Sequence, residues 1–299
     1  MEKRRIGSLE VSLVGLGCNN FGWRIDAAGT AAVMDAAIES GINFLDTADV
    51  YGGGQSEEYM GRALKGRRAK VLIASKFGMK MGEGKEGGKP AYIRQAVEDS
   101  LRRLDTDHID LYQIHKPDPS TPIADTLGAL DDLIKAGKVR EIGCSNFSAA
   151  QLREAKRFAS VQNDYSLVHR EPEAEVLPEC RRLGIAFLPY FPLANGLLTG
   201  KYRKGQPFPK SSRAEDGFGP KVFTDENLTL VETLRQFAES RGHTLLELAM
   251  SWLASKPEIA SIIAGAKTPE QVKANASSVN WRLSEADLAA LNGTLAAAV

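Results

Sequence analysis

The chain has 299 residues, a length that fits one α/β barrel or two smaller domains. Its 38 Lys and Arg residues balance its 38 Asp and Glu residues, so no net charge attracts nucleic acid or an anionic membrane surface. Neither nucleic acid nor a membrane is therefore expected as a partner, and no window approaches the roughly 20 apolar residues that a membrane span needs.

The three cysteines fit a reducing compartment. Cys18, Cys144 and Cys180 are odd in number, widely spaced and without a Cys-x-x-Cys pair, so they suggest neither a disulfide framework nor a metal site. After a basic start, the apolar stretch 11–18 is short and interrupted by glycines, which makes a poor signal peptide. We expect a cytoplasmic protein that holds no metal.

Short apolar segments alternate with longer amphipathic ones, which is the pattern of parallel strands and their covering helices. Residues 1–12 predict a hairpin that turns at Gly7 and Ser8. Eight strands are expected to end near Cys18, Ala48, Phe77, Lys116, Ser145, Tyr165, Leu193 and Ala266. Helices are expected at 27–40, 57–65, 91–104, 123–136, 149–158, 173–183, 227–240 and 245–254.

Eight strand-helix units joined by right-handed crossovers predict an α/β fold, a (β/α)8 TIM barrel, with the N-terminal β-hairpin as a cap on the opposite mouth. No linker interrupts the pattern, so residues 1–299 are expected to form a single domain. The irregular segments 78–90 and 201–220 follow strands, and we expect them to overhang the active face as cofactor-clamp or substrate-contact loops.

Four ionisable side chains stand at the ends of three consecutive predicted strands. Asp46 and Tyr51 follow residues 43–45, Lys76 follows 71–75, and His115 follows 109–114. The carboxyl ends of neighbouring parallel strands meet at one face, so these side chains should lie together. The lysine charge favours phenolate and is expected to draw the pKa of Tyr51 from about 10 toward neutrality. Such a cluster can protonate an oxygen.

Taken singly, these features have plainer explanations. An isolated Asp-Thr pair is more often a helix or turn cap, and a tyrosine beside glycines is more often a packing residue. The Gly15-Leu16-Gly17 segment fails as a dinucleotide fingerprint, because Asn20 stands where a third glycine or alanine is required. No Gly-Lys-Ser/Thr follows the glycines 52–54, which excludes a phosphate-binding P-loop.

Four segments taken together resemble the aldo-keto reductases. They are 43–58, which reads NFLDTADVYGGGQSEE, 71–77, which reads VLIASKF, 109–118, which reads IDLYQIHKPD, and 141–147, which reads EIGCSNF. The resemblance runs from about Ile6 to Asn280, with the segments in the family's order. It implies an oxidoreductase barrel that binds an extended nicotinamide cofactor and passes hydride to the carbonyl of a small aldehyde or ketone.

Carried over residue by residue, the resemblance assigns the catalytic roles. Tyr51 matches the general acid, Lys76 the group that lowers its pKa, and Asp46 the partner that anchors Lys76. His115 matches the residue that orients and polarises the substrate carbonyl. Hydride that arrives at the carbon leaves alkoxide character on the oxygen, so a positioned donor there stabilises the transition state more than the ground state.

The resemblance also implies where the cofactor binds. Its nicotinamide positions are matched by Ser145, Asn146 and Gln162, which bind the carboxamide, and by Tyr190, which stacks on the ring. The segment 192–202 resembles the loop that holds the pyrophosphate, and its contacts are Pro192, Leu193, Gly196 and Lys201. The segment 263–275 is similar to the adenosine site, and its contacts are Gly265, Lys267, Gln271 and Asn275.

The adenosine end favours NADPH, with NADH as the weaker alternative. Lys267 and Gln271 would meet a 2′-phosphate at a helix start. Two departures from the family are notable. Lys267 is a point charge where relatives often carry arginine, and Ala274 stands where many members have a glutamate that contacts adenine.

The substrate contacts are expected from loops. The chain ends at Val299, shortly after Trp281, so it resembles the bacterial-type members with a short C-terminus and not the aldose-reductase-like branch with its long C-terminal loop. We therefore expect substrate contacts from Asn20 and Trp23, after the first strand, and from the two irregular segments. Trp23 is about as well explained by core packing.

Two other functions stay open at this point. One is an NADPH-binding redox sensor or regulatory subunit with little turnover, as in the potassium-channel β subunits of the superfamily. The other, more remote, is an isomerase or lyase on the same barrel. The sequence leaves open which aldehyde or ketone is reduced, the physiological direction and the oligomeric state.

Overall fold

The computed structural model describes residues 1–209, 213–215 and 219–297, and its internal contacts divide the chain into two compact units. Unit 1 comprises Met1–Asn163, Glu171–Tyr190 and Glu258–Ala276, and unit 2 comprises Asp164–Arg170, Phe191–Pro257 and Ser277–Val299. Parts of the predicted loop 201–220, namely 210–212 and 216–218, lie outside the described residues. The single domain expected for residues 1–299 stays a prediction.

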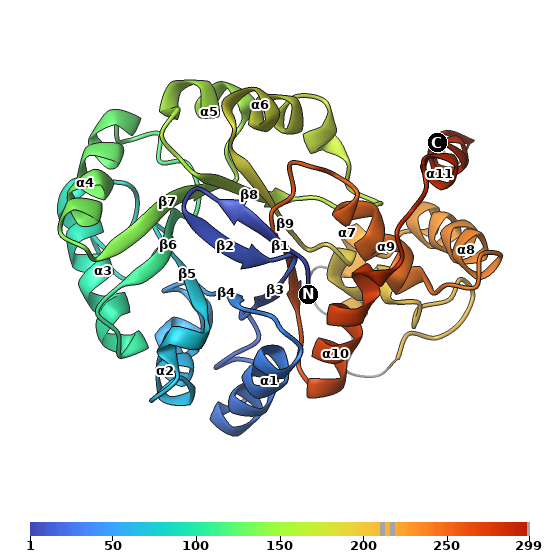
Figure 1. The fold of residues 1–299 in the computed structure, drawn as a ribbon, viewed down its shortest axis with the longest axis horizontal. Coiled ribbons are helices and arrows are strands. Elements are labelled where there is room, and N and C mark those ends of the chain that lie inside the picture. The colour runs from blue at the N-terminus through green and yellow to red at the C-terminus, as the bar shows by residue number, and fades with distance from the viewer. Residues whose placement is uncertain (210–212, 216–218, 298–299) are drawn as a thin grey trace. The chain divides into compact units, whose positions relative to one another are not determined.

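Unit 1 is built on eight parallel strands in a nearly closed barrel (Figure 1). In sheet order they are β10 (Ile262–Gly265), β3 (Val14–Gly17), β4 (Phe44–Asp46), β5 (Leu72–Phe77), β6 (Ile109–Ile114), β7 (Val139–Ser145), β8 (Ser160–Asp164) and β9 (Ala186–Tyr190). The N–H of Phe187 in β9 donates to the carbonyl of Glu258, just before β10, at 2.8 Å. The predicted barrel is confirmed, and each strand ends within three residues of its predicted end.

Helices of unit 1 pack around the outside of this barrel (Figure 1). They are α1 (Ala27–Glu39), α2 (Gln55–Ala63), α3 (Pro90–Leu104), α4 (Ile123–Lys135), α5 (Ala149–Ala155) and α6 (Val176–Leu183), and α10 (Pro269–Ser277) follows β10. Local signals fix their starts: the Asp26 side chain accepts the N–H of Gly29 in α1, and Ser148 and Gln151 form a capping box at α5. The helices predicted in this unit are confirmed, with ends shifted by a few residues.

Unit 2 is mainly helical in its described part. Its helices are α7 (Gly219–Val222), α8 (Asp225–Glu239), α9 (Leu245–Ala254) and α11 (Glu285–Ala297). Short 3-10 turns in the two units are η1 (Tyr51–Gly54), η2 (Arg68–Lys70), η3 (Glu171–Glu173), η4 (Ala194–Thr199), η5 (Arg213–Glu215) and η6 (Ser278–Asn280). Within the described residues, no helix has the length and apolar character that crossing a bilayer requires.

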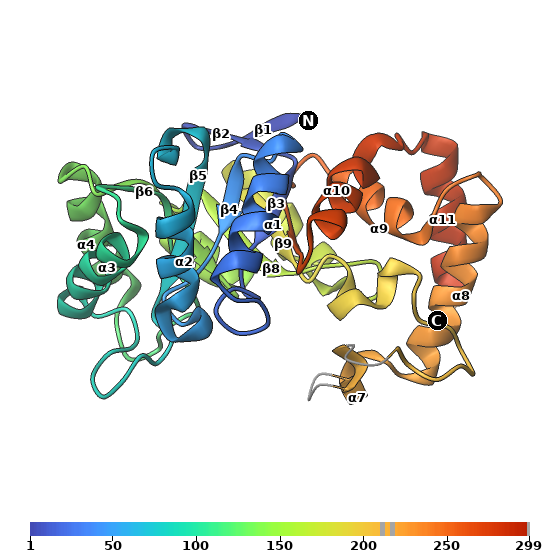
Figure 2. The same cartoon turned by 90° about the horizontal axis from the view of Figure 1, so that it is seen from below.

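The N-terminal hairpin closes the amino-terminal mouth of the barrel, as predicted. Strands β1 (Lys3–Ile6) and β2 (Leu9–Ser12) lie across that end of the barrel strands (Figure 2). Gly7 supplies the positive φ of 54° that the turn needs. The side chains of Ile6, Leu9 and Val11 are buried against the barrel core, which leaves the carboxyl-terminal mouth as the open face.

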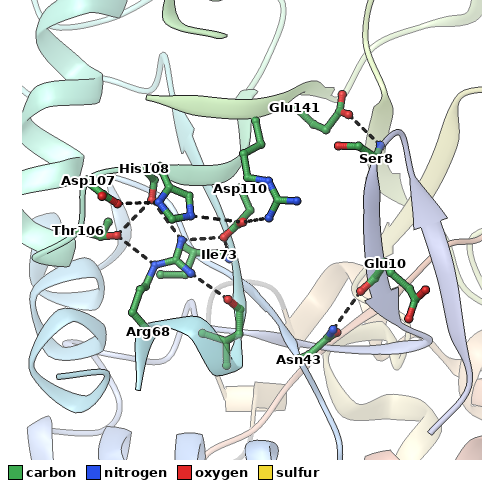
Figure 3. Close-up of polar contacts among 12 residues, drawn as sticks. Ser8, Glu10, Asn43, Arg68, Ile73, Thr106, Asp107, His108, Asp110 and Glu141 are labelled. Carbon is green, nitrogen blue, oxygen red and sulfur yellow. Dashed lines mark hydrogen bonds and ion pairs between the residues drawn. The ribbon is translucent and has the colours of Figure 1, made fainter. Parts of the chain in front are cut away.

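Asn43 ties the hairpin to the start of β4 (Figure 3). Its side-chain oxygen accepts the N–H of Ser12 at 2.7 Å, and its amide donates to the carbonyl of Glu10 at 3.0 Å. On the other side of the mouth, the Glu141 carboxylate accepts the N–H of Ser8 at 2.8 Å. The cap is thus held by directed bonds as well as by apolar packing.

Replacement of Asn43 by alanine should loosen this cap. Asn43→Ala removes two hydrogen bonds and leaves the N–H of Ser12 without its acceptor, so we expect a loss of about 1–3 kcal/mol in the free energy of unfolding. Denaturant unfolding measures the loss. Asn292→Ala, at an exposed position of α11, is the matched control and should change stability little. Equal effects of the two changes would contradict the role given to Asn43.

A buried polar cluster supports the turn that carries Tyr51. The Asp49 side chain accepts a hydrogen bond from the Tyr92 hydroxyl at 3.4 Å, and Asp49 is only 2% exposed. Nearby, the buried Glu57 carboxylate accepts from the Ser75 hydroxyl at 2.5 Å and from Arg103 at 2.7 Å. Burial, and next the charge of Glu57, raises the pKa of Asp49 to about 7. Asp49 is therefore a carboxylic acid that keeps its proton well above the usual range.

This cluster predicts a pH-dependent stability. The folded pKa of Asp49 lies above its unfolded value, so its contribution is fully present below about pH 4 and is lost as pH rises through about 7. Over this pH range the free energy of unfolding should fall by at most about 4 kcal/mol through Asp49. Asp49→Asn cannot ionise, so the variant should exceed the parent in stability at pH 8, by clearly more than at pH 5, in denaturant unfolding. The exposed Glu154→Gln in α5 is the control, and a pH-independent difference for Asp49→Asn would refute the explanation.

Candidate active site

The structure brings the four predicted ionisable residues together at the open end of the barrel. The Lys76 ammonium donates to the Asp46 carboxylate at 2.6 Å and to the carbonyl of Thr47 at 2.9 Å. Its nitrogen lies 3.5 Å from the Tyr51 hydroxyl oxygen. The rings of Tyr51 and His115 meet edge to face, with centroids 5.7 Å apart. The three strand ends therefore converge as the sequence predicted.

Glycines after Tyr51 shape the turn that holds it. Gly52 and Gly53 in η1 have φ angles of 59° and 65°, a region that other residues rarely adopt. A Cβ atom on Gly52 would come within 3.0 Å of the carbonyl oxygens of Phe21 and Gly22. The glycine run is thus required for the close approach of this turn to the loop after β3, which places the phenol beside Lys76.

Burial decides the direction of the Tyr51 pKa. Desolvation of the phenolate raises the pKa of Tyr51 above its ordinary value, and the Lys76 charge offsets only part of that rise. The predicted net fall toward neutrality is therefore wrong for this structure, because the sequence showed the lysine but not the depth of burial. Burial also lowers the pKa of Lys76, but Asp46 and Tyr51 outweigh this and raise it, so Lys76 is a cation.

His115 is a neutral imidazole at neutral pH. Burial, followed by the charges of Lys76 and Lys116, lowers the pKa of His115 to about 3. A neutral imidazole donates one hydrogen bond without adding a charge. It therefore suits the polarisation of a carbonyl next to a lysine that is already charged.

The second oxygen of Asp46 is held by two amides. Gln162 donates to Asp46 Oδ1 at 2.8 Å, and Gln113 donates to the same atom at 3.3 Å. Gln113 is not singled out in the sequence, because four of its five neighbours in 109–114 are apolar or aromatic and give the segment the look of one apolar strand. The signal that could have found it is the alternation of strand faces, which puts Gln113 on the same side of β6 as His115.

The residues predicted to bind the nicotinamide lie next to this group. The Ser145 hydroxyl donates to the carbonyl of Gln162 at 2.7 Å, and the Asn146 amide donates to the carbonyl of His115 at 3.0 Å. The Tyr190 hydroxyl donates to the Asn146 side-chain oxygen at 2.8 Å. Through the bond from Gln162 to Asp46, this cluster is continuous with the four ionisable residues.

The predicted adenosine contacts lie between the end of β10 and the last turn of α10. The N–H of Lys267 donates to the Gln271 side-chain oxygen at 2.8 Å, so these two residues are neighbours. The Asn275 amide lies 3.5 Å from the carbonyl oxygen of Gly265, which is the last residue of β10. The four predicted contacts of this segment therefore form one local group within unit 1.

The predicted pyrophosphate contacts lie in unit 2, in and around η4. They are Pro192, Leu193, Gly196 and Lys201. Ala194, Asn195 and Gly196 have φ angles of 46°, 56° and 92° in succession. Two of these are not glycines, and such strained backbone concentrates at ligand-binding segments. The N–H of Gly196 donates to the carbonyl of Leu193 at 2.8 Å, and Arg213 donates to the Asn195 side chain at 3.0 Å, which holds the turn in place.

The two predicted substrate residues have different surroundings. Trp23 is 62% exposed, which rules out core packing, and the Arg24 guanidinium lies 4.3 Å from the centroid of its ring. Asn20 is only 2% exposed, and its amide donates to the carbonyl of Ala266. That bond ties the loop after β3 to the end of β10, so the structure gives Asn20 a supporting position and leaves Trp23 as the candidate contact.

Comparisons with known proteins identify the family of the chain. The model of the aldo/keto reductase family matches residues 13–296. The aldo-keto reductase YhdN of Bacillus subtilis is 36% identical, over 96% of this chain and 91% of its own length. The uncharacterized oxidoreductase YqkF of the same organism is 35% identical, over 97% of this chain and 95% of its own.

Solved structures give the same result. The glycerol dehydrogenase AKR11B4 from Gluconobacter oxydans superposes with a TM-score of 0.87 at 34% identity, covering 99% of this chain and 96% of that one. The holo form of the aldo-keto reductase AKR11C1 from Bacillus halodurans superposes with a TM-score of 0.83 at 34% identity, covering 98% of this chain and 96% of that one. The chain belongs to the aldo/keto reductase family of oxidoreductases.

Proposed function

We propose that the protein is an NADPH-dependent reductase of aldehydes or ketones in which Tyr51 is the general acid. The observation that carries the proposal is the buried Lys76, which binds Asp46 at 2.6 Å and lies 3.5 Å from the Tyr51 hydroxyl. A cation in that position stabilises the phenolate that forms when Tyr51 gives up its proton. Asp46, in turn, holds Lys76 in place.

The residues around this centre fit a nicotinamide. Gln162 uses its amide N–H on Asp46, so its carbonyl oxygen is oriented to accept from a carboxamide. Ser145 and Asn146 add a hydroxyl and an amide, and Tyr190 adds an aromatic ring for stacking. When bound there, the nicotinamide supplies the hydride that the carbonyl carbon receives.

The protein's own part is to manage the carbonyl oxygen. Tyr51 is protonated at neutral pH, because burial raises its pKa, and it donates to the oxygen as negative charge develops there. An alkoxide is a far stronger base than a phenolate, so a raised pKa of Tyr51 does not prevent proton transfer. His115, neutral at this pH, donates a second hydrogen bond that orients the carbonyl.

The same centre also supports the reverse reaction. A similar structure is that of a glycerol dehydrogenase, and oxidation of an alcohol uses the same residues, with Tyr51 as the base. We propose that Trp23, exposed at the open end of β3, contacts the substrate. Activity should therefore be assayed in both directions, with aldehydes and ketones for reduction and small polyols for oxidation.

Tyr51→Phe tests the general acid. The change removes the donor and keeps the ring, so turnover should fall by about 10²–10⁴-fold while NADPH affinity stays within about a factor of two. Stopped-flow absorbance of the reduced nicotinamide measures turnover, and fluorescence titration measures affinity. Tyr59→Phe in α2 is the control, because the Tyr59 hydroxyl bonds only to Gln55 among the described contacts, and it should keep full turnover.

Two outcomes would change the assignment. Retained turnover in Tyr51→Phe would remove Tyr51 from the role of general acid. Tight NADPH binding by the parent protein, with no turnover on any substrate in either direction, would favour a redox sensor or regulatory subunit.

Lys267→Ala tests the preference for NADPH. We propose that the Lys267 ammonium binds the 2′-phosphate, which NADH lacks, so the change should weaken NADPH binding by about ten-fold and leave NADH binding nearly unchanged. Lys273→Ala, on an exposed position of α10, removes the same charge nearby and should affect neither cofactor. Equal losses for NADPH and NADH would mean that Lys267 does not read the phosphate.

A further inference from the structure

Gln113 is a fully buried amide next to Asp46. It lies in β6, is fully buried, and donates through Nε2 to Asp46 Oδ1 at 3.3 Å. Gly143 on β7 makes room for it, since a Cβ atom there would come 3.1 Å from the Gln113 Cγ atom. The amide orientation is fixed by chemistry, because the opposite one would set its carbonyl oxygen against the carboxylate.

Packing alone does not explain an amide at this position. The Gln113 carbonyl oxygen is buried and has no hydrogen-bond partner among the described residues. An unpaired buried acceptor normally destabilises a fold. Methionine would fill a similar volume without a polar atom. Among the described residues, the Gln113 side chain makes its hydrogen bond to Asp46, and support of that carboxylate accounts for the amide.

We propose that Gln113 is a positioning residue for the general acid: with Gln162, it fixes the Asp46 carboxylate so that Lys76 stays within reach of Tyr51. The proposal rests on the proposed function. Gln162 is expected to contact the cofactor as well, so its replacement would have mixed effects. Gln113 has no such assigned contact, so its replacement tests the support of Asp46 alone.

The electrostatic consequence has a definite direction. The N–H dipole of Gln113 points its positive end at Asp46 and so neutralises part of that charge. Without this dipole the site becomes more negative, and the phenolate of Tyr51 becomes less stable. Among the described residues, the ionisable groups that act on Tyr51 or contact its ring are Lys76 in β5, Asp46 in β4, Cys18 after β3 and His115 after β6. Replacement of Gln113 leaves these four groups in place, so a shift in the pKa of Tyr51 reports on the loss of the Gln113 amide.

The test is Gln113→Met, studied without and with cofactor. In the cofactor-free protein, tyrosinate absorbance is titrated at alkaline pH over the range in which circular dichroism shows the fold intact, and Tyr51→Phe in each background isolates the Tyr51 signal. We expect ionisation of Tyr51 to begin about half a pH unit higher in Gln113→Met. With cofactor, kcat should fall by about ten-fold and the alkaline limb of its pH profile should move upward, while NADPH affinity stays within about two-fold.

Controls separate positioning from general damage. Gln236→Met, at an exposed position of α8, should change neither the titration nor kcat. Gln113→Leu removes the same donor with a different shape and must give the same upward shift. An unmoved Tyr51 titration in either folded Gln113 variant would overturn the proposal. A shifted titration together with no turnover by the parent would uphold the positioning role and reject the reductase.

Discussion

The buried ion pair between Lys76 and Asp46 is the interaction on which the site depends. The two side chains are 0% and 3% exposed, and removal of such charges from water costs several kcal/mol per ion unless partners compensate. The compensation is visible. Lys76 also donates to the Thr47 carbonyl, and Asp46 also accepts from two amides. Loss of either charge would leave the other uncompensated, so the pair ties the stability of the barrel to its chemistry.

The barrel supplies the geometry that this pair requires. Its partners come from β4, β5, β6 and β8, and parallel pairing aligns the ends of these strands; Lys76 is directly opposite Gln113 in the register of β5 and β6. The hairpin covers the other mouth with the apolar side chains of Ile6, Leu9 and Val11. The four ionisable residues of the site therefore lie at the opposite, carboxyl-terminal end of the strands, where the loops of such a barrel carry its chemistry.

Much of this could be predicted from the sequence, and the failures have physical causes. The eight strands were visible as apolar segments, and the four ionisable residues were visible because each stands at or shortly after the carboxyl end of a strand. Gln113 was missed because one amide inside an apolar run is outweighed by its neighbours. The predicted direction of the Tyr51 pKa shift was wrong. Desolvation depends on how deeply the folded chain buries the phenol, and a local sequence pattern does not show that depth. The buried position of Asn20 depends on its contact with Ala266, a residue distant in sequence.

The sealed amino-terminal mouth has a further consequence for the order of events. Ile6, Leu9 and Val11 fill that end of the barrel, and Lys76 beneath the tyrosine is fully buried. Apolar packing on that side gives a proton lost from Tyr51 no chain of polar groups to follow from the hairpin end. We expect the proton to be replaced from the carboxyl-terminal end, where the substrate also enters, so reprotonation of Tyr51 and release of the product would use the same side of the barrel.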